Sequence, residues 1–105
     1  METKELAELV AKALEDAKGE NVKVYDVRAK SQFTDFFVVA TGAAAPHLRA
    51  LATAARDTLK TAGEKPHRAG GEADGGWMVL DSIDIVVHIF SPEARAYYAL
   101  ERLWV

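Results

Sequence analysis

Two acids in the last third of the chain come nearest, in type and spacing, to a catalytic centre. Asp81 and Asp84 flank a short turn between two apolar stretches, and pairs of carboxylates hold the metal ions of nucleotidyl transfer. That chemistry needs two acids on one face of one strand, as in Asp-x-Asp, and Asp84-Ile85-Val86 supplies only the first. The pattern favours turn and surface carboxylates, with a small metal-dependent nucleotidyltransferase as the alternative.

The serines and histidines give no better support for catalysis. A serine nucleophile sits on a strained, glycine-flanked turn beside a base, and Ser31, Ser82 and Ser91 lack such surroundings. A histidine metal site on a helix needs spacing such as i and i+4, whereas the three histidines stand about twenty residues apart. His88 lies inside an apolar stretch, which favours a histidine bonded to a neighbouring strand or carboxylate over a general base.

Phosphate-binding motifs are not found either. Ala40-Thr41-Gly42 ends an apolar stretch before a helix start, where backbone N–H groups can meet an anion. Neither GxxxxGKS/T nor GxGxxG occurs in the sequence, and the glycines between residues 70 and 76 indicate a flexible hairpin loop. These patterns predict no catalytic residue, no metal and no cofactor.

The elements that must position these residues begin with a helix and two strands. Apolar side chains at helical spacing predict a helix over about residues 3–18, ended by a left-handed Gly19. Residues 21–29 are rich in β-branched side chains, and residues 36–41 form a continuous apolar run, typical of a strand buried on both faces. A proline in the first turn and a second apolar stripe predict a helix over about residues 46–62.

In the second half of the chain the apolar period changes to two. Residues 67–71 are a candidate short strand, residues 77–81 alternate, and residues 85–90 form another doubly buried run. The acids between the last two strands predict a hairpin there. Ser91 is a natural N-cap for a closing helix that starts at Pro92.

The predicted order of elements is α-β-β-α-β-β-β-α, within a single domain that spans residues 1–105. A helix between two strands connects parallel strands by a right-handed crossover, while the later hairpins are antiparallel. We therefore expect an α/β fold, in which helices pack against a mixed β-sheet of about five strands.

Composition and charge exclude several classes of protein. The chain has no cysteine, and it shows neither a secretory signal nor an apolar run long enough for a membrane span, so we expect a cytoplasmic protein with no membrane contact. The net charge of -3 argues against specific nucleic-acid binding through a basic face. Acids outnumber bases over residues 2–18 and 81–105, whereas residues 47–68 carry five basic and two acidic residues. An acidic face steers a protein toward a basic partner, and a mixed solvated surface is the alternative.

Binding remains as the function to consider. Trp77 follows a glycine-rich stretch and precedes Asp81 and Asp84, a composition typical of a protein interface, although a tryptophan in the core is an equal alternative. Tyr97 and Tyr98 are adjacent on the closing helix, so helix geometry points one of them outward.

Several segments, taken together and in order, resemble the ribosomal silencing factor family, also called Iojap-like. The resemblance covers nearly the whole chain and rests on residues 34–42 (TDFFVVATG), His47, Gly71, residues 77–81 (WMVLD), residues 84–90 (DIVVHIF) and residues 93–104 (EARAYYALERLW).

The resemblance implies a nucleotidyltransferase-like topology that has lost catalysis. It also implies a translational repressor that binds the large ribosomal subunit through its fourteenth protein, a basic protein, and blocks association with the small subunit, especially in starvation. A homodimer of the free protein is implied as well. A large-subunit assembly factor without anti-association activity is the alternative within the same family.

The sequence departs from the family pattern at a few positions. A glycine usually precedes the acid that corresponds to Asp84, and Ile83 stands there in this chain, so we expect a different turn. Ala43-Ala44-Ala45 replace the hydroxyl residues that usually follow Thr41-Gly42, and Gly70 replaces an acid.

From the residues and the resemblance together we expect a partner-binding site on the second half of the chain. Trp77 is the expected apolar anchor, and Asp81, Asp84 and Glu101 are the acids expected to face a basic protein. Arg95 and Tyr98 are expected to shape the adjacent helix face.

Overall fold

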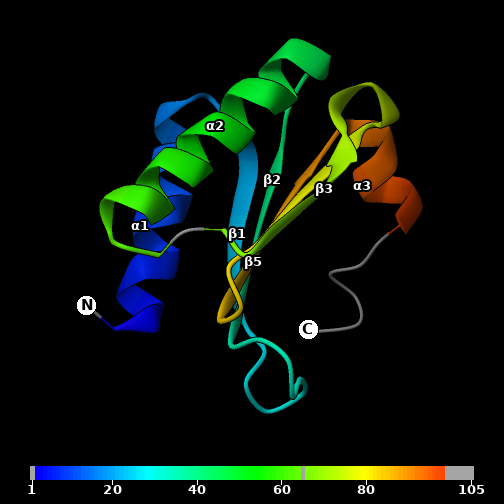
Figure 1. Ribbon diagram of the computed structural model, residues 1–105. Coiled ribbons are helices and arrows are strands. Elements are labelled where there is room, and N and C mark those ends of the chain that lie inside the picture. The colour runs from blue at the N-terminus through cyan, green and yellow to red at the C-terminus, as the bar shows by residue number, and fades with distance from the viewer. Residues whose placement is uncertain (1, 65, 99–105) are drawn as a thin grey trace.

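The computed structural model describes residues 2–64 and 66–98. Within these residues three α-helices and five strands follow one another in the predicted order, and a short 3-10 helix that was not predicted lies between the third and fourth strands (Figure 1). Their bounds are α1 Thr3–Asp16, β1 Glu20–Asp26, β2 Phe36–Thr41, α2 Ala45–Thr61, β3 Arg68–Glu72, η1 Ala73–Gly75, β4 Trp77–Asp81, β5 Ile85–Phe90 and α3 Pro92–Tyr98.

The five strands form one mixed sheet in the order β1-β2-β5-β4-β3. β2 and β5 pair in parallel, while the three other pairs, β1 with β2, β3 with β4 and β4 with β5, are antiparallel. This confirms the predicted mixed sheet and the hairpin between β4 and β5. The crossover through α2 connects β2 to β3, which run in the same direction but lie at different places in the sheet, because β5 and β4 insert between them.

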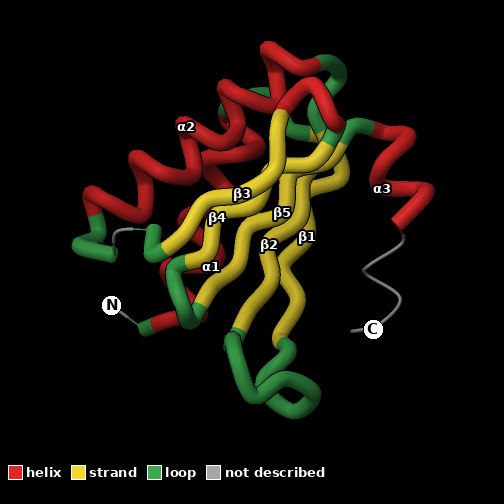
Figure 2. Tube along the Cα trace, turned by 45° about the vertical axis from the view of Figure 1, so that its right-hand side comes forward, coloured by secondary structure: helices red, strands yellow, loops and turns green. Residues whose placement is uncertain are grey.

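Helices cover the two faces of the sheet unequally. Figure 2 shows α1 and α2 on one face and the shorter α3 on the other. The main core lies under α1 and α2, where Leu14, Leu48 and Leu51 of the helices meet Val87 and Ile89 of β5, all of them fully buried. We call this face of the sheet the helix-covered face.

The end of α1 differs from the expectation in one detail. Gly19 was expected to adopt the left-handed conformation, but Lys18 adopts it, with φ of 71°. Gly19 is required for another reason, since a Cβ there would lie 2.9 Å from the Leu14 carbonyl oxygen and 3.2 Å from Leu51 Cδ2. Gly19 thus follows the left-handed Lys18 in the C-terminal cap of α1, where its N–H donates to the Leu14 carbonyl oxygen at 2.8 Å, and its missing side chain leaves room for Leu51.

His47 connects the start of α2 to the end of α1. Its Nδ1 accepts the N–H of Ala43, 3.0 Å away, and its Nε2 lies 2.9 Å from the carbonyl oxygen of Ala17. The residue before α2, Ala44, has no side chain that can cap the helix. The imidazole thus takes part in holding α2 to α1 where hydroxyl residues are missing.

The glycines near β4 do not form the flexible loop that their composition indicated. Gly70 and Gly71 belong to β3, Gly75 ends η1, and Gly76 adopts a left-handed conformation that closes it. Gly71 has φ of 76°, and a Cβ there would collide with the carbonyl oxygen of Trp77. Gly71 therefore allows β3 to run close beside β4 at Trp77, the residue expected to anchor a partner.

Within the described residues we find no helix with the length and apolar character needed to cross a bilayer.

Candidate protein-binding surface on the open face of the sheet

The face of the sheet opposite α1 and α2 carries Trp77 and Asp81, two of the residues expected to bind a partner, together with His88. Strand register places aligned residues on the same face, because side chains alternate along each strand. From β1 to β4, this face presents Tyr25, Phe37, Val39, Val86, His88, Phe90, Trp77, Val79 and Asp81. We call it the aromatic face, and α3 packs on the part of it around Val39 and Phe90 through Ala94.

His88 lies at the centre of a cluster of rings. The Phe37 ring meets it edge-on at 5.1 Å between centroids, and the rings of Trp77 and Phe90 stack with it at 5.9 Å each. Trp77 and Phe90 also stack on each other at 5.4 Å. Such ring pairs add stabilisation beyond the area they bury, so the cluster holds its members in fixed positions.

A hydrogen bond inside the cluster fixes the state of the histidine. The indole Nε1–H of Trp77 donates to His88 Nδ1 at 3.2 Å. His88 is only 8% exposed, and burial lowers its pKa from the ordinary 6.5 to about 4. The ring is therefore neutral at pH 7 with its proton on Nε2, and it positions the tryptophan. This confirms the expected bond to a neighbouring strand.

Trp77 combines the two alternatives that its sequence context left open. Its side chain is half-buried and packs against Val39, Phe90 and Ala94. The same strand continues across the face with the half-buried Val79. The indole thus belongs to the small core under α3 and also contributes to the accessible surface. Its packing and its hydrogen bond to His88 fix its position.

Asp81 stands at the other end of β4 from Trp77, four strand residues or about 13 Å away, and Asp84 follows in the turn before β5. The carboxylate of Asp81 accepts the N–H of Ile83 at 2.8 Å and pairs with Arg68 of β3 at 3.4 Å. Asp84 is exposed, and its carbonyl oxygen accepts the N–H groups of Asp35 and Phe36. Trp77 and Asp81 therefore mark two ends of the aromatic face rather than a single compact patch, whereas Asp84 lines a small hollow beside Thr3 and Leu6 of α1.

Of the three residues near the C-terminus that were expected to contact a partner, only Arg95 has a described side chain. The Arg95 guanidinium donates from Nη1 to the carbonyl oxygen of Asn21 at 2.7 Å and to the Thr41 hydroxyl at 2.8 Å, which ties α3 to β1 and β2. Tyr98 is the last residue of α3, but its side chain falls outside the part that is described. Glu101 lies outside the described residues, so partner contacts of all three stay predictions.

Tyr97 is the tyrosine that points outward, as helix geometry predicted for one of the pair, and its side chain is 76% exposed. Ser91 is confirmed as the N-cap of α3, since its Oγ accepts the N–H of Ala94 at 3.1 Å.

Two exposed apolar residues were missed in the sequence. Phe33 is 89% exposed in the loop between β1 and β2, where Ser31 Oγ accepts the N–H groups of Phe33 and Thr34. Ile83 is 57% exposed and has φ of 73° in the turn between the two acids. The available signal for Ile83 was an apolar residue in the short turn between two acids.

The positions of the two acids do not favour the alternative of a metal-dependent nucleotidyltransferase. Asp81 is engaged by its own turn and by Arg68. Over residues 2–64 and 66–98, no group of three or more histidine, aspartate or glutamate side chains is arranged to hold a metal ion. The aromatic face is an apolar and aromatic surface with Asp81 at one end, an arrangement suited to binding a protein.

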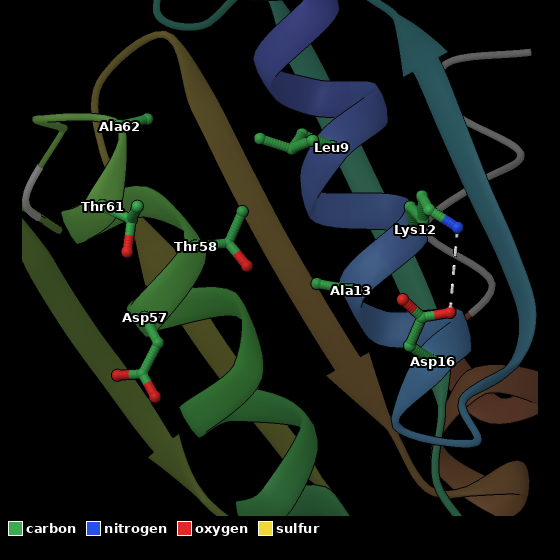
Figure 3. Close-up of a pocket in the computed structure, with 8 residues that line it drawn as sticks. All are labelled: Leu9, Lys12, Ala13, Asp16, Asp57, Thr58, Thr61 and Ala62. Atoms are coloured by element: carbon green, nitrogen blue, oxygen red, sulfur yellow. Dashed lines mark ion pairs between the residues drawn. The ribbon is translucent and has the colours of Figure 1, made fainter.

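A groove of about 430 Å³ on the opposite side of the molecule provides a contrast (Figure 3). It runs between α1 and α2, and Leu9, Ala13 and Ala62 supply its apolar part. At its edge Lys12 pairs with Asp16 at 4.0 Å. No aromatic ring lines this groove within the described residues.

Comparison with known proteins relates the whole chain to one family. The model of the family described as "Ribosomal silencing factor during starvation" matches residues 1–105. A ribosomal silencing factor of Chromobacterium violaceum is similar, with 36% identity over 104 residues, or 99% of this chain and 85% of the relative. One from Treponema pallidum shares 42% over 101 residues, or 93% of this chain and 88% of the relative.

The fold has a close counterpart among solved structures. The crystal structure of a protein from Chromobacterium violaceum superposes with a TM-score of 0.94 at 36% sequence identity. The match covers 99% of this chain and 87% of that one.

Proposed function

The chain belongs to the ribosomal silencing factor family, and from this premise we propose that residues 1–105 act as a single domain that represses translation in the cytoplasm. The protein binds the large ribosomal subunit through that subunit's fourteenth protein and blocks association with the small subunit, especially in starvation. It acts by binding rather than by catalysis.

The observation that carries this proposal is the rigid, half-buried Trp77 on the sheet face that α1 and α2 leave open. Tryptophan is enriched among the residues that dominate protein interfaces, most of all where neighbours pre-order its side chain and exclude water around it. The bond to His88 and the stacking on Phe90 provide that order. A partner that covers the aromatic face meets an anchor whose conformation is already set.

Charge supports a basic partner. The chain carries a net charge of -3, and Asp81 and Asp84 stand at the turn that ends β4. Acids at the border of an interface accelerate encounter with a basic protein and fix its orientation, more than they add affinity. The fourteenth protein of the large subunit is basic, so the aromatic face supplies apolar affinity and the Asp81–Asp84 turn supplies steering.

Sedimentation of purified ribosomal subunits tests the proposal. The protein is added to large and small subunits under ionic conditions in which they normally join. We expect it to travel with the large subunit and to reduce the joined peak. Binding without any loss of joining would replace repression by an assembly role, and failure to bind either subunit would refute ribosome association altogether.

Charge reversal at the turn tests the electrostatic part. Asp84→Lys is expected to keep the fold, because Asp84 contributes to the turn through its backbone carbonyl, and to weaken binding to the large subunit about fivefold at low salt. Glu8→Lys on the exposed side of α1 is the control with the same change in net charge. Equal binding of both variants at low and high salt would remove Asp84 from the interface.

The free protein is proposed to form a homodimer, since a second copy is a natural cover for an aromatic face without its ribosomal partner. Sedimentation equilibrium of the purified protein would show a dimer that dissociates when the fourteenth protein is added. A monomer at all concentrations would contradict this.

A further inference from the structure

A basic hollow lies beside the aromatic face and has no part in the function proposed above. It has a volume of about 400 Å³ and lies between the C-terminal half of α2 and the edge strand β3. Four side chains that carry or can carry positive charge contribute to its lining, and Pro66 and Ala69 complete it. The four are Arg56, Lys60, His67 and Arg68.

The acids near these four side chains in sequence line other hollows of the surface. Arg56 and Lys60 are one helical turn apart on α2, so both side chains reach the same side of the helix. Asp57, the acid next to Arg56 in sequence, lines the groove between α1 and α2 instead (Figure 3). Glu64 lines a different small hollow, near Ser82 and Asp84. The described lining of the basic hollow therefore contains no acid.

The chemistry of this lining suits phosphate groups. Guanidinium groups bind phosphate with two parallel hydrogen bonds, and an ammonium group adds a compact charge. Arg56 is half-buried, so part of its side chain is already ordered before a ligand binds. Arg68 extends from the hollow to the aromatic face, where it pairs with Asp81 at 3.4 Å. A cationic hollow thus adjoins a surface with acids at its edge.

We propose that the basic hollow binds the phosphate backbone of RNA beside the protein partner. The inference rests on the proposed function for the source of that RNA, which is the ribosomal RNA next to the fourteenth protein of the large subunit. Basic ribosomal proteins are embedded in RNA, and a surface with acids beside cations fits the border between the two. The contact is to the backbone, with no reading of base sequence.

A titration followed by NMR tests the hollow on the protein alone. A ten-nucleotide oligouridylate is added at low salt to ¹⁵N-labelled protein. We expect the amides of Arg56, Lys60, His67 and Arg68 to shift, while those of α1 stay unchanged. Absence of shifts in the hollow at millimolar RNA would overturn the proposal.

Two further probes identify the chemistry. Inorganic phosphate is expected to bind the hollow at least about tenfold more weakly than the oligonucleotide, since only the chain presents several phosphates at once. Decaglutamate is also expected to bind more weakly. Equal affinity for phosphate would make the hollow a site for the free ion, and equal affinity for decaglutamate would make it a site for an acidic peptide; either result contradicts RNA binding.

Paired variants connect the hollow to the subunit. Arg56→Gln with Lys60→Gln removes two cations and spares Arg68, which contacts Asp81. Lys4→Gln with Lys12→Gln on α1 is the control with the same change in charge. Affinity for large subunits falls as salt rises, and the hollow variant should show a shallower fall. The slope of log affinity against log salt should decrease in magnitude by about 1.4, or roughly 0.7 for each lost phosphate contact. Binding to the isolated fourteenth protein stays unchanged.

The outcomes separate this inference from the proposed function. If the wild-type protein does not bind the large subunit, the proposed function fails, while the oligouridylate titration still decides whether the hollow binds RNA. If the hollow and control variants show equal salt slopes on the subunit, ribosomal RNA is not the ligand and the inference fails. Weaker binding of the hollow variant to the isolated protein would assign the hollow to a protein contact and also overturn it.

Discussion

The two faces of the sheet differ in the type of side chain they carry and in how completely it is buried. The helix-covered face buries aliphatic side chains completely, such as Val38 of β2 and Val87 of β5, against leucines of α1 and α2. The aromatic face places rings on the same strands but leaves Phe37, Trp77 and Val86 half-buried. Only the short α3 packs there among the described elements. Full burial on one face supplies stability, and incomplete burial on the other leaves the accessible surface that we propose a partner covers.

The comparison also shows how a polar residue is used within an apolar surface. His88 is buried on the aromatic face, and its neutral Nδ1 is satisfied by the Trp77 indole. A histidine at this position specifies where the tryptophan lies, which an aliphatic residue of similar size cannot do. On the aromatic face a side-chain hydrogen bond fixes the positions of the rings, whereas on the helix-covered face aliphatic packing fixes the side chains.

The largest effect is expected on the helix-covered face. Leu51→Ala in α2 removes a fully buried side chain from the main core and should lower the free energy of unfolding by about 3–4 kcal/mol. Urea unfolding measures the loss. Because Leu51 lies far from the aromatic face, the folded fraction should bind the large subunit as the wild type does. Weaker binding by the folded protein would break the division between the faces.

The next effect depends on pH and belongs to the aromatic face. Burial lowers the pKa of His88 to about 4, while the unfolded chain has the ordinary value of 6.5. Between these values the unfolded state binds the extra proton, so the free energy of unfolding should fall as pH decreases from 6.5 to 4, by up to about 3 kcal/mol. His88→Gln should lose this part of the pH dependence. Parallel unfolding profiles of wild type and variant over this range would show that His88 is not responsible.

Trp77→Ala tests the anchor itself. It should weaken binding to the large subunit by about 2 kcal/mol, the size typical of an interface hot spot. Leu9→Ala, in the groove between α1 and α2, is the matched truncation on the opposite side and should not change binding. Circular dichroism verifies that both variants fold. An unfolded Trp77→Ala variant would assign the tryptophan to the core instead.

The smallest effect concerns the strained turn between the acids. Ile83 has φ of 73°, a conformation that disfavours β-branched residues, and it is 57% exposed. Ile83→Gly should raise the free energy of unfolding by about 0.5–1 kcal/mol, whereas Ile83→Ala retains the left-handed strain and should give no gain. Thermal unfolding of the two variants measures the difference. Equal stability of both would show that the turn stores no strain.

Much of the fold was accessible from local patterns. Helical stripes, the doubly buried runs of β2 and β5, and the turn acids predicted the elements, their order and the hairpin of β4 with β5. The pairing of β2 with β5, far apart in sequence, required tertiary structure. Gly19 shows the same limit, because its place at the end of α1 was predicted, whereas the need for a residue without a side chain there also depends on the distance to Leu51.

The candidate surface could be predicted only in part. Period-two alternation placed Trp77 and Asp81 on one strand face, but the Trp77–His88 hydrogen bond joins two strands and leaves no sequence signal. Arg95 was expected to shape the helix face beside the partner-binding site, and the sequence did not indicate that its guanidinium binds Asn21 and Thr41 across the fold. The basic excess of residues 47–68 was visible, whereas its concentration in one hollow depends on how α2 lies beside β3.

Hydroxyl-radical footprinting of the protein bound to large ribosomal subunits tests the central claim most directly. Trp77 and Phe37 report on the aromatic face, and Leu9, 42% exposed, reports on the groove between α1 and α2. We predict that binding protects Trp77 and Phe37 from oxidation and leaves Leu9 as reactive as in the free protein. Protection of Leu9 with unchanged oxidation of Trp77 would show that the helices, and not the aromatic face, contact the subunit.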